Sequence, residues 1–486
     1  MRISCVQLTK LPVHSLSGAQ QSHVASLVDP ILAYESLLSP IVFSVSAHYN
    51  RAIRAPKTRV TVSRLTSKLG ATITVQIGLD SRPTCIDLFA GAGGLAEGFR
   101  QAGWCILAGL DDAPSAASTF RLNFPESEFL EENICALDPE RLLTHFRLKP
   151  GQLDCLIGGP PCQSFSYNNH ARSASNHRAH LFRQYLRVVA SLKPKTLVME
   201  NVPGMLTIGD GKIVREIKRD LAALGYESCI KILFAEDFGV PQRRRRVFII
   251  ATKLGWEHKL FPTGTHGPSE KPSESVNNYV HQWRPRKGQV PQKLTNVWNA
   301  IGDLPSLENG GGVDITPYGR KPKTEFQRQS RRGSPEIHNH RTRRLTSSML
   351  RRIRNVPEGG NWLDIPRQWL PSGMKRAKTS DHTKRYGRLS RRDLSSTILT
   401  KCDPHWGSYV HPLEERTISV REAARLQTFP DRFRFTGSLS KQYELIGNAV
   451  PPLLAKQVAR SVLRYLDRRS RSDSRTGLPE KHRQRA

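Results

Sequence analysis

A short apolar run that ends in glycines, prolines and a cysteine constrains this chain more than any other feature. Residues 153–157 (LDCLI) have the length and character of a buried strand, and residues 158–161 (GGPP) stop it with strong breakers. Ligands of open α/β sheets bind beyond the carboxyl ends of the strands, so a cysteine held there, here Cys162, can be a nucleophile. The alternative is an inert cysteine beside a tight turn, which is the commoner role of an isolated cysteine.

A second predicted strand runs directly into a glycine-rich turn at residues 84–94 (TCIDLFAGAGG), and a helix is predicted to follow. Gly91 and Gly93 remove side chains where the backbone must approach a ligand, and the helix N-terminus offers free N–H groups. The next strand ends at Asp111, where an acidic residue can bind a ribose hydroxyl. Taken alone, this pattern also permits a dinucleotide, because Gly91, Gly93 and Ala96 loosely satisfy G-x-G-x-x-G/A.

Two further polar motifs adjoin predicted strands. A strand predicted at residues 195–200 ends at Glu200, and a helix separates it from the Cys162 strand in a βαβ unit. Glu200 and Cys162 are therefore expected at the same edge of the sheet. Residues 239–250 (GVPQRRRRVFII) lead four arginines into an apolar strand, so alternate side chains must face opposite sides. A surface carboxylate and a solvated basic run are the alternatives.

In their order along the chain, these motifs resemble those of the DNA cytosine-5 methyltransferases. PPCQSFS resembles the family's catalytic motif, DLFAGAGG its S-adenosylmethionine loop, ENV at residues 200–202 its second catalytic motif, and IGNAVPPLL at residues 446–454 its closing motif. The resemblance covers roughly residues 84–464. It implies a doubly wound, mostly parallel α/β sheet of the S-adenosylmethionine-dependent type, with a smaller, irregular target-recognition domain.

The resemblance also implies roles for individual residues. Cys162, Glu200, Arg244 and Arg246 would be catalytic, and no metal is expected. Asn133 stands where the family has an aspartate that accepts from the adenine amino group, and its amide oxygen can still accept, without charge. The residues expected to bind S-adenosylmethionine are Phe89, Ala90, Gly91, Gly93, Gly94, Asp111, Asn133, Ile134, Pro160, Asn448 and Ala449.

The chain divides into five parts by composition and motif. Residues 1–80 carry no motif, and could be a docking domain, a basic arm for DNA or an over-extended start of the reading frame. Residues 81–255 and 387–466 would form a discontinuous catalytic domain. Residues 256–386 are rich in Pro, Gly, Ser, Arg and Lys, but Trp283, Trp298, Trp362 and Trp369 favour a recognition domain with a small core over a linker. The basic tail, residues 467–486, is expected to be disordered or in loose contact with phosphates.

Charge and cysteine usage indicate partners and compartment. The net charge of +32, from 74 Lys and Arg against 42 Asp and Glu, points to a polyanion such as nucleic acid, with an anionic membrane surface as the competitor. Eight cysteines without a Cys-x-x-Cys pair argue against structural zinc and a disulfide framework, and fit a reducing cytoplasm. The most apolar early segment, residues 28–47, is interrupted by charges and prolines and cannot span a membrane.

The implied activity is methyl transfer from S-adenosylmethionine to carbon 5 of a cytosine flipped out of a short, specific double-stranded DNA sequence, through a covalent Cys162 adduct. A monomeric prokaryotic enzyme of a restriction–modification system, with a cognate restriction endonuclease acting on the same site, is the expected setting. A solitary regulatory DNA methyltransferase and a transfer-RNA cytosine-5 methyltransferase are alternatives, although the latter would lack so large a recognition domain. A dinucleotide-dependent oxidoreductase would leave Cys162 and Glu200 unexplained, and intact catalytic residues speak against a silent DNA-binding protein.

Overall fold

The computed structural model describes residues 58–67, 70–79, 82–161, 181–257, 260–267, 277–283, 285, 288, 290–379 and 384–476. Cys162 lies outside the described residues, as do most of the N-terminal extension and the last ten positions of the chain.

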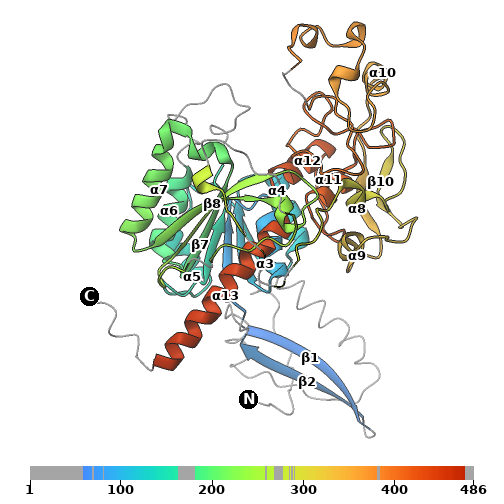
Figure 1. The fold of residues 1–486 in the computed structure, drawn as a ribbon. Helices are drawn as coiled ribbons and strands as arrows, with labels where there is room; N and C mark the ends of the chain where they lie inside the picture. The colour runs from blue at the N-terminus through green and yellow to red at the C-terminus, as the bar shows by residue number, and fades with distance from the viewer. Residues whose placement is uncertain are drawn as a thin grey trace.

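A seven-stranded sheet forms the centre of the molecule, in the order β5-β4-β3-β6-β7-β9-β8 (Figure 1). The first five strands are parallel to their neighbours, whereas β9 is antiparallel to both β7 and β8. Strands buried on both faces are mostly apolar, which explains the run CLI in β6. The strands are β3 (Thr84–Leu88), β4 (Cys105–Asp111), β5 (Glu128–Glu131), β6 (Cys155–Gly158), β7 (Thr196–Asn201), β8 (Glu227–Phe234) and β9 (Arg245–Thr252).

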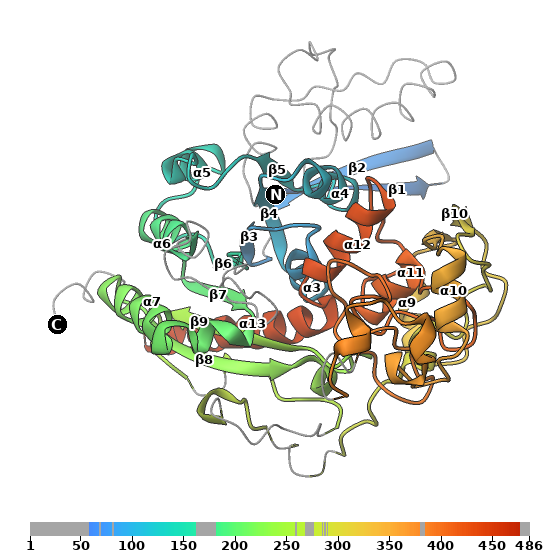
Figure 2. The ribbon, with the colours of Figure 1, turned by 90° about the horizontal axis from the view of Figure 1, so that it is seen from above.

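Helices cover both faces of this sheet, and side chains alternate between the two cores (Figure 2). In β6, Cys155 and Ile157 point to one core while Leu156 points to the other. The first core is covered by α3 (Gly94–Gln101), α4 (Pro114–Asn123) and α13 (Pro452–Thr476), and the second by α5 (Pro139–His145), α6 (Leu181–Leu192) and α7 (Lys212–Ala223). The predicted doubly wound, mostly parallel fold is confirmed.

The C-terminal helix α13 returns to the start of the domain and packs against α3. A Cβ on Gly98 would collide with Ala455, so only glycine permits this approach. The helix also continues to Thr476, so the expectation of disorder from residue 467 is wrong for its first ten residues. The reason is that Arg468 and Arg469 form ion pairs with Glu257, which hold the extra turns against the domain.

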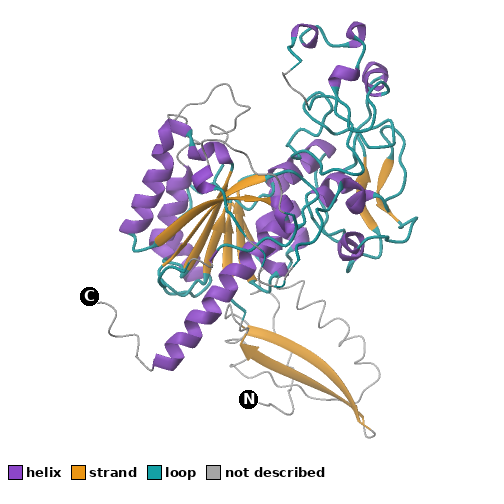
Figure 3. Ribbon diagram, viewed as in Figure 1, coloured by secondary structure: helices purple, strands orange, loops and turns teal. Residues whose placement is uncertain are grey.

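A smaller region built mainly of loops lies beside the sheet domain (Figure 3). Its core of nine buried residues is centred on Trp362, with Trp369 packed against it. The small core and irregular character agree with the predicted recognition domain, whose boundaries stay a prediction. Its elements are α8 (Val297–Ile301), β10 (Gly312–Thr316), α9 (Glu325–Arg331), β11 (Ile337–Arg341), α10 (Ser347–Ile353), η8 (Trp362–Asp364), η9 (Arg367–Trp369) and η10 (Met374–Arg376).

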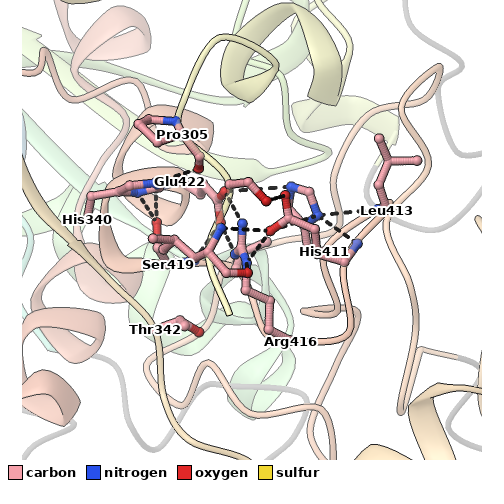
Figure 4. Close-up of polar contacts among 12 residues, drawn as sticks. Pro305, His340, Thr342, His411, Leu413, Arg416, Ser419 and Glu422 are labelled. Carbon is pink, nitrogen blue, oxygen red and sulfur yellow. Dashed lines mark hydrogen bonds and ion pairs between the residues drawn. The ribbon is translucent and has the colours of Figure 1, made fainter. Parts of the chain in front are cut away.

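A buried polar cluster joins this region to α11 (Val420–Leu426), and Figure 4 shows its contacts. We call it the joint cluster: His340, Thr342, His411, Arg416, Ser419 and Glu422. Both terminal nitrogens of Arg416 donate to the Glu422 carboxylate, at 2.8 and 2.9 Å. His340 contacts Ser419 Oγ and the Pro305 carbonyl, both at 2.9 Å. The cluster therefore ties β11 and the Pro305 segment to the helix that leads back into the catalytic domain.

The remaining described elements connect or extend these bodies. Strands β1 (Thr58–Ser67) and β2 (Gly70–Leu79) form a separate antiparallel ribbon within the N-terminal extension. Along the described chain, no helix is both long and apolar enough to cross a membrane. The other elements are η3 (Pro203–Leu206), η4 (Ile208–Gly211), η5 (Ala235–Phe238), η7 (Asn277–Tyr279) and α12 (Leu439–Asn448).

Candidate active site

The glycine-rich turn after β3 is shaped for a ligand. Phe89, Gly91 and Gly93 all have positive φ angles, of 58°, 53° and 90°. The Gly91 N–H donates to Asp111 Oδ2 at 2.9 Å, which ties the turn to the end of β4. A Cβ on Gly91 would meet no atom within 4 Å, so the turn borders open space. Burial raises the pKa of Asp111, although hydrogen bonds from Gly91 and Ala113 N–H groups oppose the rise.

The closing motif lies against this turn, as the sequence predicts. A Cβ on Gly94 would collide with the Val450 carbonyl and with Ala449, so the two segments are in backbone contact. Asn448 ends α12 immediately before Ala449. Residues separated by more than 350 positions in the chain thus lie in direct contact beside the glycine-rich turn.

The turn expected to hold the adenine explains its unusual asparagine. Asn133 Nδ2 lies 3.3 Å from Asp112 Oδ2, and Asn133 Oδ1 accepts from the Cys135 N–H at 2.9 Å. An aspartate at position 133 would face Asp112 with like charge, so asparagine suits this neighbour. Ile134 is buried beside it.

A positioning residue that the sequence reasoning missed is Arg187 on α6. Its guanidinium donates to the carbonyls of Ile134 and Leu137 at 2.7 and 2.8 Å. These bonds hold the turn at residues 133–137, here called the adenine turn because the sequence predicts that it contacts the adenine. Nothing in the sequence of α6, which also carries Arg183 and Gln184, marks Arg187 for this role.

Glu200 and Arg246 meet at the carboxyl edge of the sheet. Glu200 belongs to the end of β7, and Arg246 to the start of the neighbouring strand β9. Arg246 Nε lies 2.8 Å from Glu200 Oε1, with side chains only 13% and 11% exposed. Burial raises the pKa of Glu200, and the positive charges of Arg246 and Arg244 offset the rise only in part. The carboxyl group therefore takes up a proton more readily than an exposed glutamate.

The loop that leads to Cys162 crosses directly over this pair. A Cβ on Gly159 would lie 3.0 Å from Glu200 Oε2, which explains the glycine before the prolines. Asn201 Nδ2 donates to the Pro160 carbonyl at 3.2 Å and anchors the loop. Asn201 is a second positioning residue that sequence reasoning passed over, although it belongs to the ENV motif. The position of Cys162 itself lies outside the described residues.

Arg244 is expected from the sequence to be catalytic, and its positive charge acts on Glu200, but its guanidinium hydrogen-bonds to backbone carbonyls of other segments. It is fully buried, and its guanidinium donates to the carbonyls of Ile398, Gly447 and Ala449 at 2.9, 2.8 and 3.0 Å. Arg246 pairs with Glu200, whereas Arg244, which precedes the first residue of β9, donates to the carbonyls of Gly447 and Ala449 in the closing motif. We assign Arg244 to positioning rather than to contact with the base.

No metal centre is visible in the described part of the chain, where no three His, Cys, Asp or Glu side chains gather closely enough to hold an ion.

Comparison with known proteins identifies the family. The family model for C-5 cytosine-specific DNA methylases matches residues 83–464. The chain is 31% identical over 425 residues to the type II methyltransferase M.AgeI of Thalassovita gelatinovora, covering 78% of this chain and 98% of the relative. It is 34% identical over 384 residues to the type II methyltransferase M1.HphI of Haemophilus parahaemolyticus, covering 78% and 87%.

A crystal structure described as a prophage-encoded DNA modification methyltransferase from E. coli matches the fold, with a TM-score of 0.59 and 24% identity over 79% of this chain and 99% of that one. The sheet, the glycine turn and the paired carboxylate and arginine at its edge define a cofactor-dependent transferase. The chain belongs to the C-5 cytosine-specific DNA methylases, of the bacterial modification type. It is an enzyme that methylates DNA at cytosine with S-adenosylmethionine as methyl donor, as the sequence predicts.

Proposed function

We propose that this methyltransferase acts on a cytosine flipped out of one short, specific duplex sequence, through a covalent adduct between Cys162 and carbon 6. The observation that carries the proposal is the buried Glu200–Arg246 pair beneath the loop that leads to Cys162. A base edge inserted there would meet a carboxyl group of raised pKa, which can share a proton with ring nitrogen 3.

The chemistry requires an electron-rich ring, because carbon 5 of cytosine is a weak nucleophile. The Cys162 thiolate adds to carbon 6, and Glu200 stabilises the developing charge by hydrogen bonds to nitrogen 3 and the exocyclic amine. Carbon 5 then receives the methyl group that S-adenosylmethionine supplies. Loss of the carbon 5 proton and release of Cys162 restore the aromatic ring. Arg246 orients Glu200, and nearby positive charge favours the thiolate.

The residues of this chain fit the methyl donor. Phe89 would pack against its adenine, and the backbone of Ala90, Gly91, Gly93 and Gly94 would approach the donor closely. Asp111, which already ties this turn to β4, would accept from the ribose hydroxyls. Asn133 and Ile134 would contact the adenine, and Pro160, Asn448 and Ala449 would close the pocket. Flipping the base costs a few kcal/mol, which contacts with a protein of +32 charge can offset.

The proposed setting is a restriction–modification system, in which the enzyme acts as a monomer and an endonuclease recognises the same sequence without forming a required complex. The type II methyltransferases among its relatives support this setting. A solitary regulatory enzyme would carry out the same chemistry.

The test is transfer of labelled methyl from S-adenosylmethionine to unmethylated duplex DNA and, separately, to transfer RNA. We expect label on carbon 5 of one short DNA sequence, and none with Cys162→Ser. A duplex with 5-fluorocytosine at the mapped position should trap the wild-type protein, because fluorine cannot leave as the proton does, and should not trap Cys162→Ser. Transfer to RNA alone, or activity that survives the cysteine change, would contradict the proposal. Protection of the mapped sequence from an endonuclease would test the setting.

A further inference from the structure

An exposed tryptophan with two cations beside its ring lies on the loop formed by residues 401–408, here called the Trp406 loop. Trp406 is 50% exposed, although most large apolar side chains of the described chain are buried. The Arg385 guanidinium lies 5.5 Å from the centre of its ring, and Lys401 Nζ lies 5.6 Å away. An aromatic face flanked by mobile positive charges is the combination that proteins use to grip nucleic acid strands.

Hydrogen bonds within the Trp406 loop order the backbone that carries the ring. The Asp403 carboxylate accepts from the His405 N–H at 2.9 Å, and the Asp403 carbonyl accepts from the Trp406 N–H at 2.9 Å. Arg343 clamps the same carboxylate at 3.1 Å. A pre-ordered aromatic side chain loses little conformational entropy when a partner covers it.

The loop begins where the arginine motif and the closing motif meet. The Ile398 carbonyl accepts from Arg244, two residues before the active-site Arg246. Next along the chain, the backbone of Leu399 and Thr400 packs so closely against Gly447 that no Cβ would fit there. The loop therefore begins directly after residues that contact both Arg244 and the closing motif.

We propose that the Trp406 loop is a DNA contact beside the target base. The indole ring packs against a nucleotide, and Arg385 and Lys401 turn from the ring to the flanking phosphates. This inference rests on the proposed function, because it takes duplex DNA as the substrate. The chain's charge of +32 favours an anionic partner. A protein partner could cover the exposed ring, but its binding would not require the two cations beside the ring.

The experiment measures binding of the full chain to a fluorescein-labelled, random-sequence duplex over a range of NaCl concentrations, with S-adenosylhomocysteine present. Trp406→Ala should raise Kd roughly five- to hundredfold, and Trp406→Phe should recover most of the loss. Lys401→Gln should lower the slope of log K against log salt by about one, whereas Trp406→Ala should leave that slope unchanged. Leu413→Ala is the matched control, because Leu413 is 52% exposed and lies in the same segment.

Equal binding by Trp406→Ala and Leu413→Ala would overturn the proposal while leaving the proposed function intact. A wild-type chain that does not bind duplex DNA would overturn both. If Trp406→Ala melts at a lower temperature, its weaker binding could result from unfolding. The binding of Trp406→Phe and Lys401→Gln then tests the proposal, because both variants keep an aromatic ring in the loop. Weakened binding together with methyl transfer that survives Cys162→Ser would support the contact and contradict the covalent mechanism.

Discussion

Two buried glutamate–arginine pairs in this molecule have opposite electrostatic characters. Among the residues that the structure describes, Glu200 forms one ion pair, with Arg246, and burial raises the pKa of its carboxyl group. Burial alone would also raise the pKa of Glu422, but Arg416 binds both its oxygens and holds that pKa well below its usual range. The Ser419 N–H donates to the same carboxylate at 2.6 Å.

The difference separates a carboxylate that stabilises the fold from one that is available for chemistry. Donors of the protein itself occupy the acceptor sites of the Glu422 carboxylate, which stabilises its ionised form. The carboxylate is therefore not available to bind a substrate. Glu200 is buried but incompletely satisfied, and a cytosine edge could supply the missing partners. The comparison therefore predicts that equivalent substitutions at the two sites will affect different properties.

The largest expected effect is on catalysis, from Glu200→Gln. The amide cannot deliver a proton to nitrogen 3, so we expect kcat to fall by about 10³-fold, or about 4 kcal/mol of barrier. The melting temperature should change little. Single-turnover methyl transfer at saturating DNA measures the effect, with Glu216→Gln as a control, because Glu216 pairs with the exposed Arg183 on the outer helices. A variant with normal single-turnover rate would remove Glu200 from the mechanism.

The next effect is on stability, from Glu422→Gln. This change removes the carboxylate that accepts from both terminal nitrogens of the buried Arg416 and leaves Glu414 as its remaining charged partner; breaking such a buried pair costs about 3 kcal/mol. We expect a lower urea midpoint but a near-normal single-turnover rate for the protein that remains folded. If Glu422→Gln instead lost activity without losing stability, the distinction between the two pairs would fail.

The comparison also predicts opposite responses to acid. Burial alone would raise the pKa of Asp431, but its ion pair with Arg425 lowers it from 3.8 to about 2. A folded pKa below the unfolded one adds stability that is fully present above about pH 4 and is lost as pH falls towards about 2. The loss should be on the order of 2 kcal/mol, visible in urea titrations at stepped pH. Asp431→Asn should flatten this dependence.

Glu200 should act in the other direction, because its folded pKa is raised. It favours the folded protein below its unfolded pKa, and that contribution is lost as pH rises through the folded pKa. Glu200→Gln should remove this fall in the free energy of unfolding at higher pH. If Glu200→Gln and Asp431→Asn changed the pH dependence of stability in the same direction, the assigned pKa shifts would be contradicted.

Local sequence patterns were enough to predict the central fold and the edge of the sheet where the site lies. Strand-length apolar runs, breakers and glycines are read within a few residues, and the structure places Glu200 beside the loop that leads to Cys162, as those patterns predict. The family resemblance, not a local pattern, pointed to Arg246, which pairs with Glu200. The limits of the local approach appear at Arg244. The carbonyls that accept from its guanidinium lie more than 150 residues away, so the local sequence does not reveal that the side chain binds them.

The same limit explains why the joint cluster was not anticipated. Its members are ordinary polar residues in sequence, and they become a unit only when β11 and α11 meet. The end of α13 was misjudged for a related reason. A basic tail looks solvated by composition, but Glu257, about 210 residues earlier, pairs with its arginines.

The smallest expected effect tests whether a structural arginine can act on the reaction through the cofactor. Arg187 has neither a catalytic partner, as Arg246 has, nor a buried carboxylate, as Arg416 has, and instead donates to two carbonyls of the adenine turn. Arg187→Met should raise KM for S-adenosylmethionine roughly fivefold, because about 1 kcal/mol of hydrogen bonding is lost, while kcat stays near normal. Arg187→Lys should recover part of the loss, and Arg183→Met, on the exposed side of the same helix, should have no effect. A fall in kcat at saturating cofactor would show instead that α6 positions the catalytic loop, which follows β6 and ends where this helix begins.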